Sequence, residues 1–375
     1  MSLPRVRPDL EALGGYHSPQ LDVKIRLNTN EAPSAPGPAF TAAVQERLTD
    51  IAWHRYPDRQ VTALREGLAA LHGVSPDQIF CANGSNEVLQ TLLLTYGGAG
   101  RTVLTFEPTY AMHAHIAKIT GATSVVGERT STFEVDLDDA SRLIDTHRPS
   151  VAFLCSPNNP TGTTETESNI RAMASKMAEV GGLLAVDEAY GQFAPWSALN
   201  MVDNETPLVV TRTFSKTWAM AGARLGYAVG PVAVIQEFDK VVLPYHLDAA
   251  KQATGLVALD FIDDADQRVA EIVEQRGYIA AQLLEMGAEV WPSGANFVLF
   301  RVMSGSSPTV EDGQRVWDGL VKRSVLVRNT AGWDRLEGCL RVTVGTPAEN
   351  QSFLDALRDT LDELGASDAQ RGSHT

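Results

Sequence analysis

The sequence predicts an α/β protein: a large domain with a mostly parallel sheet covered by helices, followed by a smaller α+β domain. Three observations predict this fold. From residue 78 to residue 229, short apolar runs alternate with amphipathic segments, as in parallel strands connected by helices. Polar clusters of Gly, Ser, Asn, Asp and Pro follow most of these runs directly. The chain of 375 residues is also longer than one compact core accommodates, so we expect two domains.

The N-terminal segment, residues 1–40, is predicted to be an arm that belongs to the small domain. Its first part is rich in Pro, Gly and Asn, which favours extended chain. Turn residues between positions 33 and 38 precede a helical pattern over 39–48. A second turn at 56–58 precedes a helix over 61–72.

The large domain is predicted to span residues 41–245. Apolar runs rich in Val, Ile and Leu indicate its buried strands. We expect these strands at 79–82, 102–106, 124–126, 151–155, 183–186, 208–211 and 225–229. Amphipathic patterns between them predict helices at 87–96, in the segment ending near 121, at 138–146 and at 167–179.

A connecting helix is predicted in residues 246–286, where a continuous helical pattern from about residue 249 is long enough to bridge two domains. The small domain then spans residues 287–375. Its expected strands lie at 297–302, 325–328 and 340–344, and its helices at 310–322 and 347–364. The tail from residue 365 is small and polar, so we expect it to fray.

Composition limits the partners and the compartment. The net charge of −15, without any Lys/Arg-rich run, argues against nucleic acid. No stretch approaches ~18 consecutive apolar residues, and the first residues lack the apolar core of a signal peptide, so we expect no membrane segment and no export. Cys81, Cys155 and Cys339 lie in apolar runs without metal-type spacing, which predicts reduced, buried thiols in a cytoplasmic protein.

The stretch from Thr213 to Arg224 combines a nucleophile with an anion site. Lys216 follows an apolar run among small hydroxyl residues, where partial desolvation lowers an amine's pKa and lets it attack an aldehyde. Arg224 can hold an anion with two hydrogen bonds, helped by Thr213 and Ser215. Pyridoxal phosphate requires a lysine for a Schiff base and a phosphate site. By itself this spacing is not specific, because a surface lysine near a serine is more common.

Other polar residues follow the remaining strands, and ligands of open parallel sheets bind beyond the carboxyl ends of the strands. Ser85 and Asn86 open a helix whose N–H groups can bind a phosphate. Tyr110 can stack on a planar ring. Each residue alone has a simpler interpretation as a helix cap, a turn residue or a core aromatic.

Three further residues could contact the ring of the same cofactor. Asp187 follows an apolar strand, and a buried carboxylate there requires a cation such as a protonated pyridine nitrogen. Asn159 and Tyr190 can both reach the ring oxygen of the cofactor. Five such features at one sheet edge, in the order needed around one cofactor, favour a pyridoxal-phosphate site over separate structural roles.

Several motifs carry a family resemblance nearly from end to end. They are LNTNEAP, RYPD, ANGSNE, EPTYAMH, SPNNPTG, VDEAY, RTFSKTWAMAGARLGY, LPY, NFVLFR, VLVRN and CLRVTVGT. In these motifs the chain resembles the fold-type-I aminotransferases that depend on pyridoxal 5′-phosphate, and among them the histidinol-phosphate aminotransferase subfamily. One departure concerns the substrate: the usual Asn-Glu-Asn-Pro of the family has Ala32 in its third position.

The resemblance implies a role for each residue at the strand ends. Lys216 forms the Schiff base and then moves protons as a general acid and base. Asp187 pairs with the pyridine nitrogen, Tyr190 and Asn159 bind the ring oxygen, and Tyr110 stacks on the ring. The residues implied in phosphate binding are Ser85, Asn86, Thr213, Ser215 and Arg224, together with Tyr56 from the other subunit of a homodimer.

The resemblance also implies a substrate. Arg341 grips the α-carboxylate of an amino acid, and Arg328, Tyr16 and Asn30 lie toward the distal end, where a phosphate sits. L-Histidinol phosphate has a phosphate and no carboxylate, whereas glutamate has two carboxylates, and guanidinium groups fit both anions. We therefore expect transamination between L-histidinol phosphate and 2-oxoglutarate, giving imidazole acetol phosphate and L-glutamate in histidine biosynthesis.

The sequence is also compatible with other functions of this fold. An aromatic amino-acid aminotransferase differs mainly in the shape of its pocket, and a pyridoxal-phosphate-dependent phosphothreonine decarboxylase uses the same fold. A regulator that senses the cofactor requires an added DNA-binding domain, for which the chain before residue 78 leaves little room.

His113 and His115 lie two apart on one predicted helix and face different directions, so we predict no metal site there.

Overall fold

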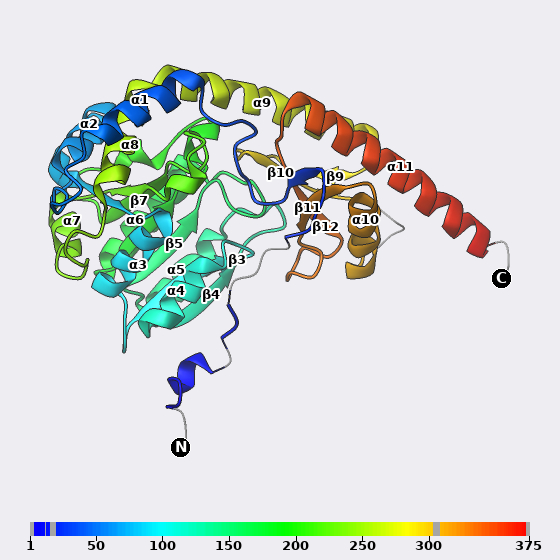
Figure 1. The fold of residues 1–375 in the computed structure, drawn as a ribbon. Helices are drawn as coiled ribbons and strands as arrows, with labels where there is room; N and C mark the ends of the chain where they lie inside the picture. Colours follow the sequence, from blue (N-terminus) through cyan, green and yellow to red (C-terminus); the bar gives the residue numbers. More distant parts are fainter. Residues whose placement is uncertain (1–3, 12, 16–19, 303–307, 373–375) are drawn as a thin grey trace.

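Two β-sheets and the helices that cover them make up the structure, a computed structural model that describes residues 4–11, 13–15, 20–302 and 308–372 (Figure 1). The seven-stranded sheet has the order β2 (Ile79–Ala82), β8 (Gly226–Val229), β7 (Leu208–Thr213), β6 (Leu183–Asp187), β5 (Val151–Cys155), β3 (Thr102–Glu107) and β4 (Thr123–Glu128). Its strand pairs are parallel except for the two that β8 makes, with β2 and β7. The predicted α/β class is confirmed.

Helices cover both faces of this sheet because alternate side chains of each central strand enter different cores. One face carries α3 (Ser85–Tyr96), α4 (Met112–Thr120) and α7 (Val232–Phe238), and the other carries α2 (Thr62–His72), α5 (Leu137–His147), α6 (Glu167–Glu179) and α8 (Ala249–Asp260). In β5, for example, Val151 and Phe153 pack toward α3 and α4, whereas Ala152 and Leu154 pack toward α5 and α6. Helix α1 (Pro38–Thr49) lies against α8.

The five-stranded sheet has the order β1 (Ile25–Leu27), β11 (Val325–Asn329), β12 (Cys339–Thr343), β10 (Phe297–Arg301) and β9 (Glu289–Val290). One of its faces packs against α9 (Ile262–Glu285), α10 (Val310–Lys322) and α11 (Pro347–Gly372). The N-terminal arm joins this sheet, because β1 pairs in parallel with β11. The domain boundaries expected from the sequence stay a prediction.

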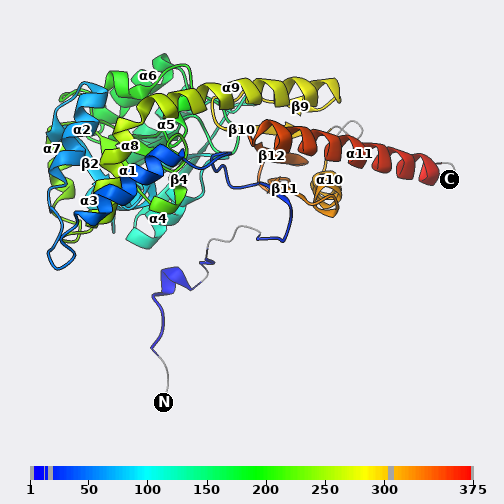
Figure 2. The same ribbon diagram turned by 45° about the horizontal axis from the view of Figure 1, so that its top comes forward.

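The connecting helix differs from the sequence-based expectation of one continuous helix from about residue 249 to 286. The helix is interrupted at Phe261, whose backbone leaves the helical region (φ −113°, ψ 36°) and whose ring packs edge-on against Phe40 at 5.6 Å. After this break α9 runs from the seven-stranded sheet to the five-stranded sheet, beside α11 (Figures 1 and 2). Ala265 packs in the core beside the seven-stranded sheet, whereas Ile272 and Ile279 pack in the core of the five-stranded sheet.

Three short elements and one helix end were not predicted. β1 and β9 have only three and two residues, and α7 has seven, so their patterns are too short to recognise. The predicted fraying from residue 365 is wrong, because α11 continues to Gly372.

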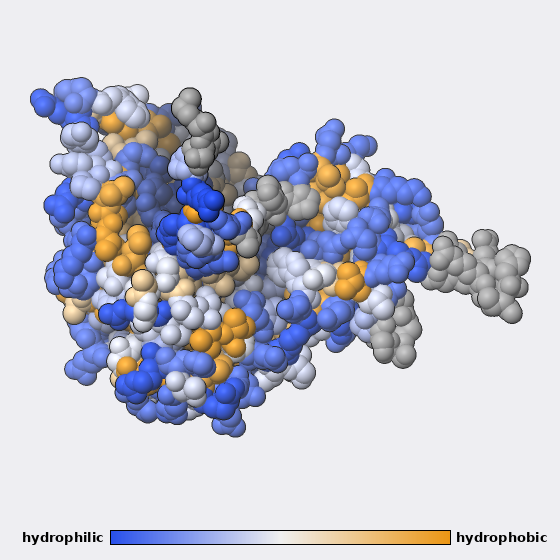
Figure 3. Space-filling view, turned by 90° about the horizontal axis from the view of Figure 1, so that it is seen from below, coloured by the Kyte–Doolittle hydropathy of each residue, from blue (hydrophilic) through white to orange (hydrophobic). Residues whose placement is uncertain are grey.

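The surface seen in one view is largely polar. The face seen from below is mostly hydrophilic, and its apolar side chains gather in small, separate patches (Figure 3). Within the described residues, no helix has the length and apolar character needed to cross a bilayer. Cys81, Cys155 and Cys339 are buried and free.

Candidate active site

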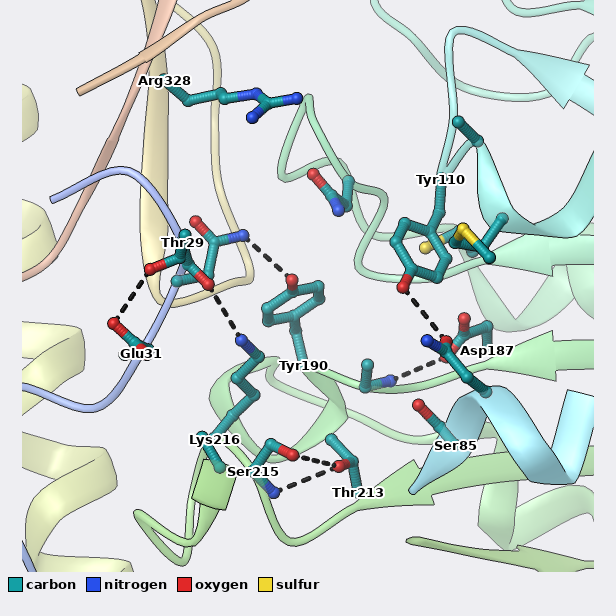
Figure 4. A pocket seen from close by; sticks show the side chains of 18 of the residues that line it. Thr29, Glu31, Ser85, Tyr110, Asp187, Tyr190, Thr213, Ser215, Lys216 and Arg328 are labelled. Atoms are coloured by element: carbon teal, nitrogen blue, oxygen red, sulfur yellow. Dashed lines mark hydrogen bonds between the residues drawn. The ribbon is translucent and has the colours of Figure 1, made fainter. Parts of the chain in front are cut away.

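A pocket of about 630 Å³ lies where the carboxyl ends of the parallel strands face the five-stranded sheet. The predicted residues that line it are Asn30, Ser85, Asn86, Tyr110, Asn159, Asp187, Tyr190, Thr213, Ser215, Lys216, Arg224, Arg328 and Arg341. Lys216 extends into its middle, and Arg328 enters from the side opposite Thr213 and Ser215 (Figure 4). The fold therefore gathers nearly all of the predicted set in one place.

Lys216 lies in the turn that follows β7, and its Nζ donates to the backbone oxygen of Thr29 at 3.2 Å. The pKa of this amine is lowered to about 7, chiefly by burial and next by the positive charge of Arg341, although Glu31 acts in the opposite direction. A large fraction of the amine is therefore neutral near pH 7, which is the form that attacks an aldehyde.

The start of α3 and the turn after β7 form a cradle for an anion. No side chain caps α3, which follows Gly84 and begins at Ser85, so its first N–H groups are available to a ligand. Thr213 Oγ1 donates to Ser215 Oγ at 2.9 Å, and Arg224 Nη1 donates to the same oxygen at 3.3 Å. A helix N-terminus, two hydroxyls and a guanidinium together suit a phosphate.

Two glycines keep the cradle open. A Cβ atom on Gly84, whose φ is +83°, would lie 2.7 Å from Nη2 of Arg224. A Cβ atom on Gly226 would lie 2.4 Å from the backbone nitrogen of Ser85. Any side chain at either position would displace a group that we expect to contact the phosphate.

Asp187 ends β6 with only 1% of its surface exposed. Its carboxylate accepts hydrogen bonds from the Ala189 N–H at 3.1 Å, from Thr211 Oγ1 at 3.2 Å and from His113 Nε2 at 3.0 Å. The His113 ring is buried and stacks on Phe153 with ring centres 4.6 Å apart. The carboxylate is thus held in a single orientation toward the pocket.

Tyr190 is oriented by Asn30, whose Nδ2 donates to the phenol oxygen at 2.9 Å. Asn30 is itself fixed by Thr343, which accepts from its N–H at 3.0 Å and donates to its Oδ1 at 3.1 Å. Burial raises the pKa of Tyr190 to about 12, so the phenol keeps its proton and can donate to an oxygen on a bound ring. Asn30, predicted from the sequence as a substrate residue, therefore also positions Tyr190.

Asn159 is oriented by Arg341. Nη1 of Arg341 donates to the Asn159 Oδ1, and its Nη2 donates to the backbone oxygen of Asn28 at 2.9 Å. Because the amide oxygen of Asn159 is engaged, its NH₂ group is the one left to donate to a ring oxygen. The Arg341 guanidinium lies 5.0 Å from the ring centre of Phe297, which limits its movement.

Tyr110 lies in the turn after β3, and its hydroxyl donates to Oδ1 of Asn86 at 3.1 Å. The turn is held by Asn158, which is fully buried. Asn158 accepts from Thr109 Oγ1 at 2.7 Å and donates to the backbone oxygen of Pro108 at 3.0 Å. This bridge fixes the Tyr110 turn against the loop that follows β5.

Arg328 and Arg341 share one face of the five-stranded sheet. They are register partners on the antiparallel strands β11 and β12, so their side chains leave the sheet on the same side. Like charges directly opposite each other are destabilising in a sheet. An anion with two charged groups that binds between them would remove this repulsion.

One described residue of the predicted set, Tyr56, does not line the pocket. Tyr56 is 80% exposed and stacks on Tyr245 with ring centres 4.5 Å apart, so its implied contact across a subunit boundary stays a prediction. Tyr16 lies outside the described residues. Within the described ranges, no group of three or more His, Cys, Asp or Glu side chains could hold a metal ion.

Sequence reasoning missed four residues of this site: Thr29, His113, Asn158 and Trp333. His113 could have been found, because it lies only three residues after Tyr110, in the first turn of the helix that follows. The others follow from long-range contacts between the two sheets, which leave no local pattern in the sequence.

Comparisons with known proteins identify the family. A model of the family described as aminotransferase class I and II matches residues 22–357. The chain belongs to this family. Histidinol-phosphate aminotransferase from Corynebacterium diphtheriae is 39% identical over 372 residues, which cover 96% of this chain and 97% of that protein. The enzyme of the same name from Thermobifida fusca is 42% identical over 361 residues, covering 94% of each.

A solved structure shows the fold of this aminotransferase. The crystal structure of histidinol-phosphate aminotransferase from Sinorhizobium meliloti in complex with pyridoxal-5′-phosphate matches with a TM-score of 0.87 at 24% identity, covering 97% of this chain and 99% of that chain. The fold is that of the fold-type-I pyridoxal-phosphate aminotransferases.

The donors in the aminotransferase pocket fit pyridoxal phosphate chemically. A lysine amine with a lowered pKa suits the aldehyde, and a buried carboxylate suits the pyridine nitrogen. The uncapped helix start with its hydroxyls and Arg224 suits the phosphate. Tyr110 supplies an aromatic face that lines the same pocket.

Proposed function

We propose that this aminotransferase moves an amino group from L-histidinol phosphate to 2-oxoglutarate, giving imidazole acetol phosphate and L-glutamate in histidine biosynthesis. The observation that carries this proposal is the pair Arg328 and Arg341, register partners in a pocket that also holds Lys216. The names of relatives about 40% identical to the chain support the same reaction. The cofactor is pyridoxal 5′-phosphate.

The cofactor, when bound, supplies an electron sink that stabilises negative charge on the substrate's α-carbon. We assign Asp187 to the pyridine nitrogen, Tyr190 and Asn159 to the ring oxygen, and Tyr110 to the ring face. The residues assigned to the phosphate are Ser85, Asn86, Thr213, Ser215 and Arg224.

Lys216 moves the proton. With the cofactor bound, its amine would take the proton from the α-carbon of the amino donor and give it to the cofactor carbon attached to the same nitrogen, and it would make the reverse transfer to the α-carbon of 2-oxoglutarate. A group with a pKa near the working pH, about 7 for this lysine, serves both as base and as acid. The hydrogen bond to the Thr29 oxygen holds Nζ at the centre of the pocket. Tyr190 remains protonated and donates, so the base in this site is the lysine.

The two arginines bind both substrates in turn. Glutamate presents its α-carboxylate to Arg341 and its distal carboxylate to Arg328. L-Histidinol phosphate has no α-carboxylate, and its phosphate binds on the side of Arg328. A planar guanidinium accepts carboxylate and phosphate with the same paired hydrogen bonds, so no rearrangement is needed between the two half-reactions.

Amino transfer to 2-oxoglutarate tests the proposal. The purified enzyme with pyridoxal phosphate is given 2-oxoglutarate and one of three donors: L-histidinol phosphate, L-phenylalanine or O-phospho-L-threonine. We expect glutamate to form with L-histidinol phosphate at the lowest donor concentration, and not at all in Lys216→Ala. Equal use of L-phenylalanine would instead assign an aromatic aminotransferase, and release of CO₂ from O-phospho-L-threonine would assign a decarboxylase.

We also propose a homodimer that works in the cytoplasm. Exposed apolar side chains in two neighbouring loops support an interface between copies: Trp53, Tyr56, Leu243 and Tyr245. Three buried, free cysteines suit a reducing compartment. Light scattering after gel filtration should give twice the chain mass of 40.5 kDa. Tyr56→Phe should weaken pyridoxal-phosphate binding without changing this mass, if the hydroxyl reaches the partner's phosphate site.

A further inference from the structure

Two arginine–tryptophan pairs lie on the side of the five-stranded sheet that faces the seven-stranded sheet. The guanidinium of Arg328 lies 5.5 Å from the ring centre of Trp333, and that of Arg301 lies 5.2 Å from Trp291. The pairs differ in their surroundings. Arg301 is held by the carboxylate of Glu289, with Nε at 3.0 Å from Oε2. Neither Arg301 nor Trp291 lines the pocket. Arg328 and Trp333 both line it.

We propose that Trp333 is a positioning residue that determines specificity: its indole holds the Arg328 guanidinium in the pocket and so favours substrates with a distal anionic group. This inference rests on the proposed function. A guanidinium on an indole face is attracted to the ring, more strongly when water is excluded. Stacking also removes rotamer freedom that arginine otherwise loses on binding an anion.

Trp333 is itself held rigidly. Its backbone N–H donates to the backbone oxygen of Thr330 at 2.9 Å, and its backbone oxygen accepts from the N–H of Leu336 at 3.0 Å. The same loop is tied to the segment that follows β4, because Arg335 Nη2 donates to the backbone oxygen of Thr130 at 2.8 Å. The Arg335 guanidinium also lies 6.0 Å from the ring centre of Phe133. These contacts fix the loop, and the indole itself packs, partly buried, against the cluster of Phe133, Leu299, Leu336 and Cys339.

The need for such a surface follows from the register of the two arginines. Arg328 lies directly opposite Arg341 on the neighbouring strand, and repulsion between the two charges favours conformations in which Arg328 turns away. Arg341 is fixed by Asn159, Asn28 and Phe297. Trp333 gives Arg328 a corresponding support, so both charges stay directed at the ligand. A substrate without a distal anion does not use this arrangement.

Four variants test the inference in the holoenzyme: Trp333→Ala, Trp333→Phe, Arg328→Gln and the double variant Trp333→Ala/Arg328→Gln. In Trp333→Ala we expect the KM for L-histidinol phosphate to rise about 5- to 30-fold with little change in kcat, the size of a cation–π contact of ~1–2 kcal/mol. The KM for L-phenylalanine should change less than about twofold. Trp333→Phe should keep most of the preference, because a phenyl ring also attracts the guanidinium.

A binding measurement without turnover separates positioning from catalysis. Succinate, a dicarboxylate that cannot be transaminated, is titrated into each holoenzyme by calorimetry. Its Kd should rise about 5- to 30-fold in Trp333→Ala, and the double variant should bind no more weakly than Arg328→Gln alone, because the indole acts through that arginine. Additive losses in the double variant would overturn the proposal.

Trp291→Ala is the matched control, because it removes an indole from beneath an arginine on the same sheet face but outside the pocket. It should leave the ratio of the two KM values and the Kd of succinate unchanged. Equal losses for L-phenylalanine and L-histidinol phosphate in Trp333→Ala, or the same losses in Trp291→Ala, would show a merely structural role. If Trp333→Ala does not fold, Trp333→Phe and Trp333→Leu provide the same comparison. Wild-type enzyme that does not use L-histidinol phosphate would instead refute the proposed function.

Discussion

His113 Nε2 lies 3.0 Å from Oδ2 of Asp187, and both side chains are almost completely buried. The bond joins α4 to the end of β6 across one face of the seven-stranded sheet. The ring of His113 is also in edge-on contact with Tyr110, with ring centres 5.5 Å apart. One histidine therefore contacts both the carboxylate assigned to the pyridine nitrogen and the aromatic ring assigned to the cofactor face.

Replacing His113 should weaken cofactor binding without unfolding the protein. In His113→Phe the ring still stacks on Phe153, but the hydrogen bond to the Asp187 carboxylate is lost. A hydrogen bond to a charged group contributes ~1.5–3 kcal/mol, so we expect the Kd of pyridoxal phosphate to rise about tenfold or more. Fluorescence titration of the apoprotein measures this Kd. An unchanged value would show that Asp187 is oriented without the histidine.

The lowered pKa of Lys216 predicts how cofactor uptake depends on pH. Below about pH 7 the amine is protonated and does not attack the aldehyde, and above that pH it is neutral. The rate at which apoprotein binds pyridoxal phosphate covalently should therefore rise with a midpoint near pH 7. A midpoint near pH ~10, as for an exposed lysine, would contradict the burial of this amine.

Arg341→Gln supplies a second comparison for the same lysine. The charge of Arg341 is the second largest cause that lowers the Lys216 pKa, after burial. Removing it should move the midpoint of the uptake profile to higher pH. Stopped-flow mixing over a pH series measures both profiles, and Lys216→Ala gives the baseline without covalent uptake.

Gly226→Ala should damage the phosphate cradle through the backbone. The added Cβ atom would lie 2.4 Å from the Ser85 nitrogen and 2.6 Å from the carbonyl carbon of Gly84, so the start of α3 must shift. Overpacking of this kind costs ~1–3 kcal/mol, and we expect pyridoxal phosphate to bind about tenfold more weakly or worse. Gly222→Ala is the control, since nothing lies within 4 Å of its Cβ position.

The buried ion pair between Arg129 and Glu165 should stabilise the large sheet. Arg129 Nη1 donates to Glu165 Oε1 at 2.8 Å, and the two side chains are 1% and 0% exposed. Arg129→Met leaves the carboxylate buried without its partner, so the free energy of unfolding should fall by ~3–5 kcal/mol. Arg171→Met removes an exposed partner of Glu167 and should have no measurable effect in the same urea titration.

Most of the predicted residues that line the pocket could be placed there from the sequence, because they lie at the carboxyl ends of parallel strands. Asp187 ends its apolar strand, and Ser85 and Lys216 each come three residues after a strand ends, so their common sheet edge follows from strand order alone. Asn30 and Trp333 could not be placed in this way. Asn30 contacts Tyr190, which is 160 residues away, and Trp333 lies in a loop braced by Thr130.

The sequence by itself determined the α/β class, the strands of the large sheet and the chemistry of the cofactor site. These properties depend on local patterns: short apolar runs of strand length that alternate with amphipathic segments, and polar residues that follow them. Only the tertiary structure decided which groups orient the side chains that line the pocket. The pairing of Arg328 with Arg341, the contact of His113 with Asp187 and the stacking of Trp333 on Arg328 all join distant segments. Such contacts arise when the two sheets pack, and packing depends on the shape of the whole chain.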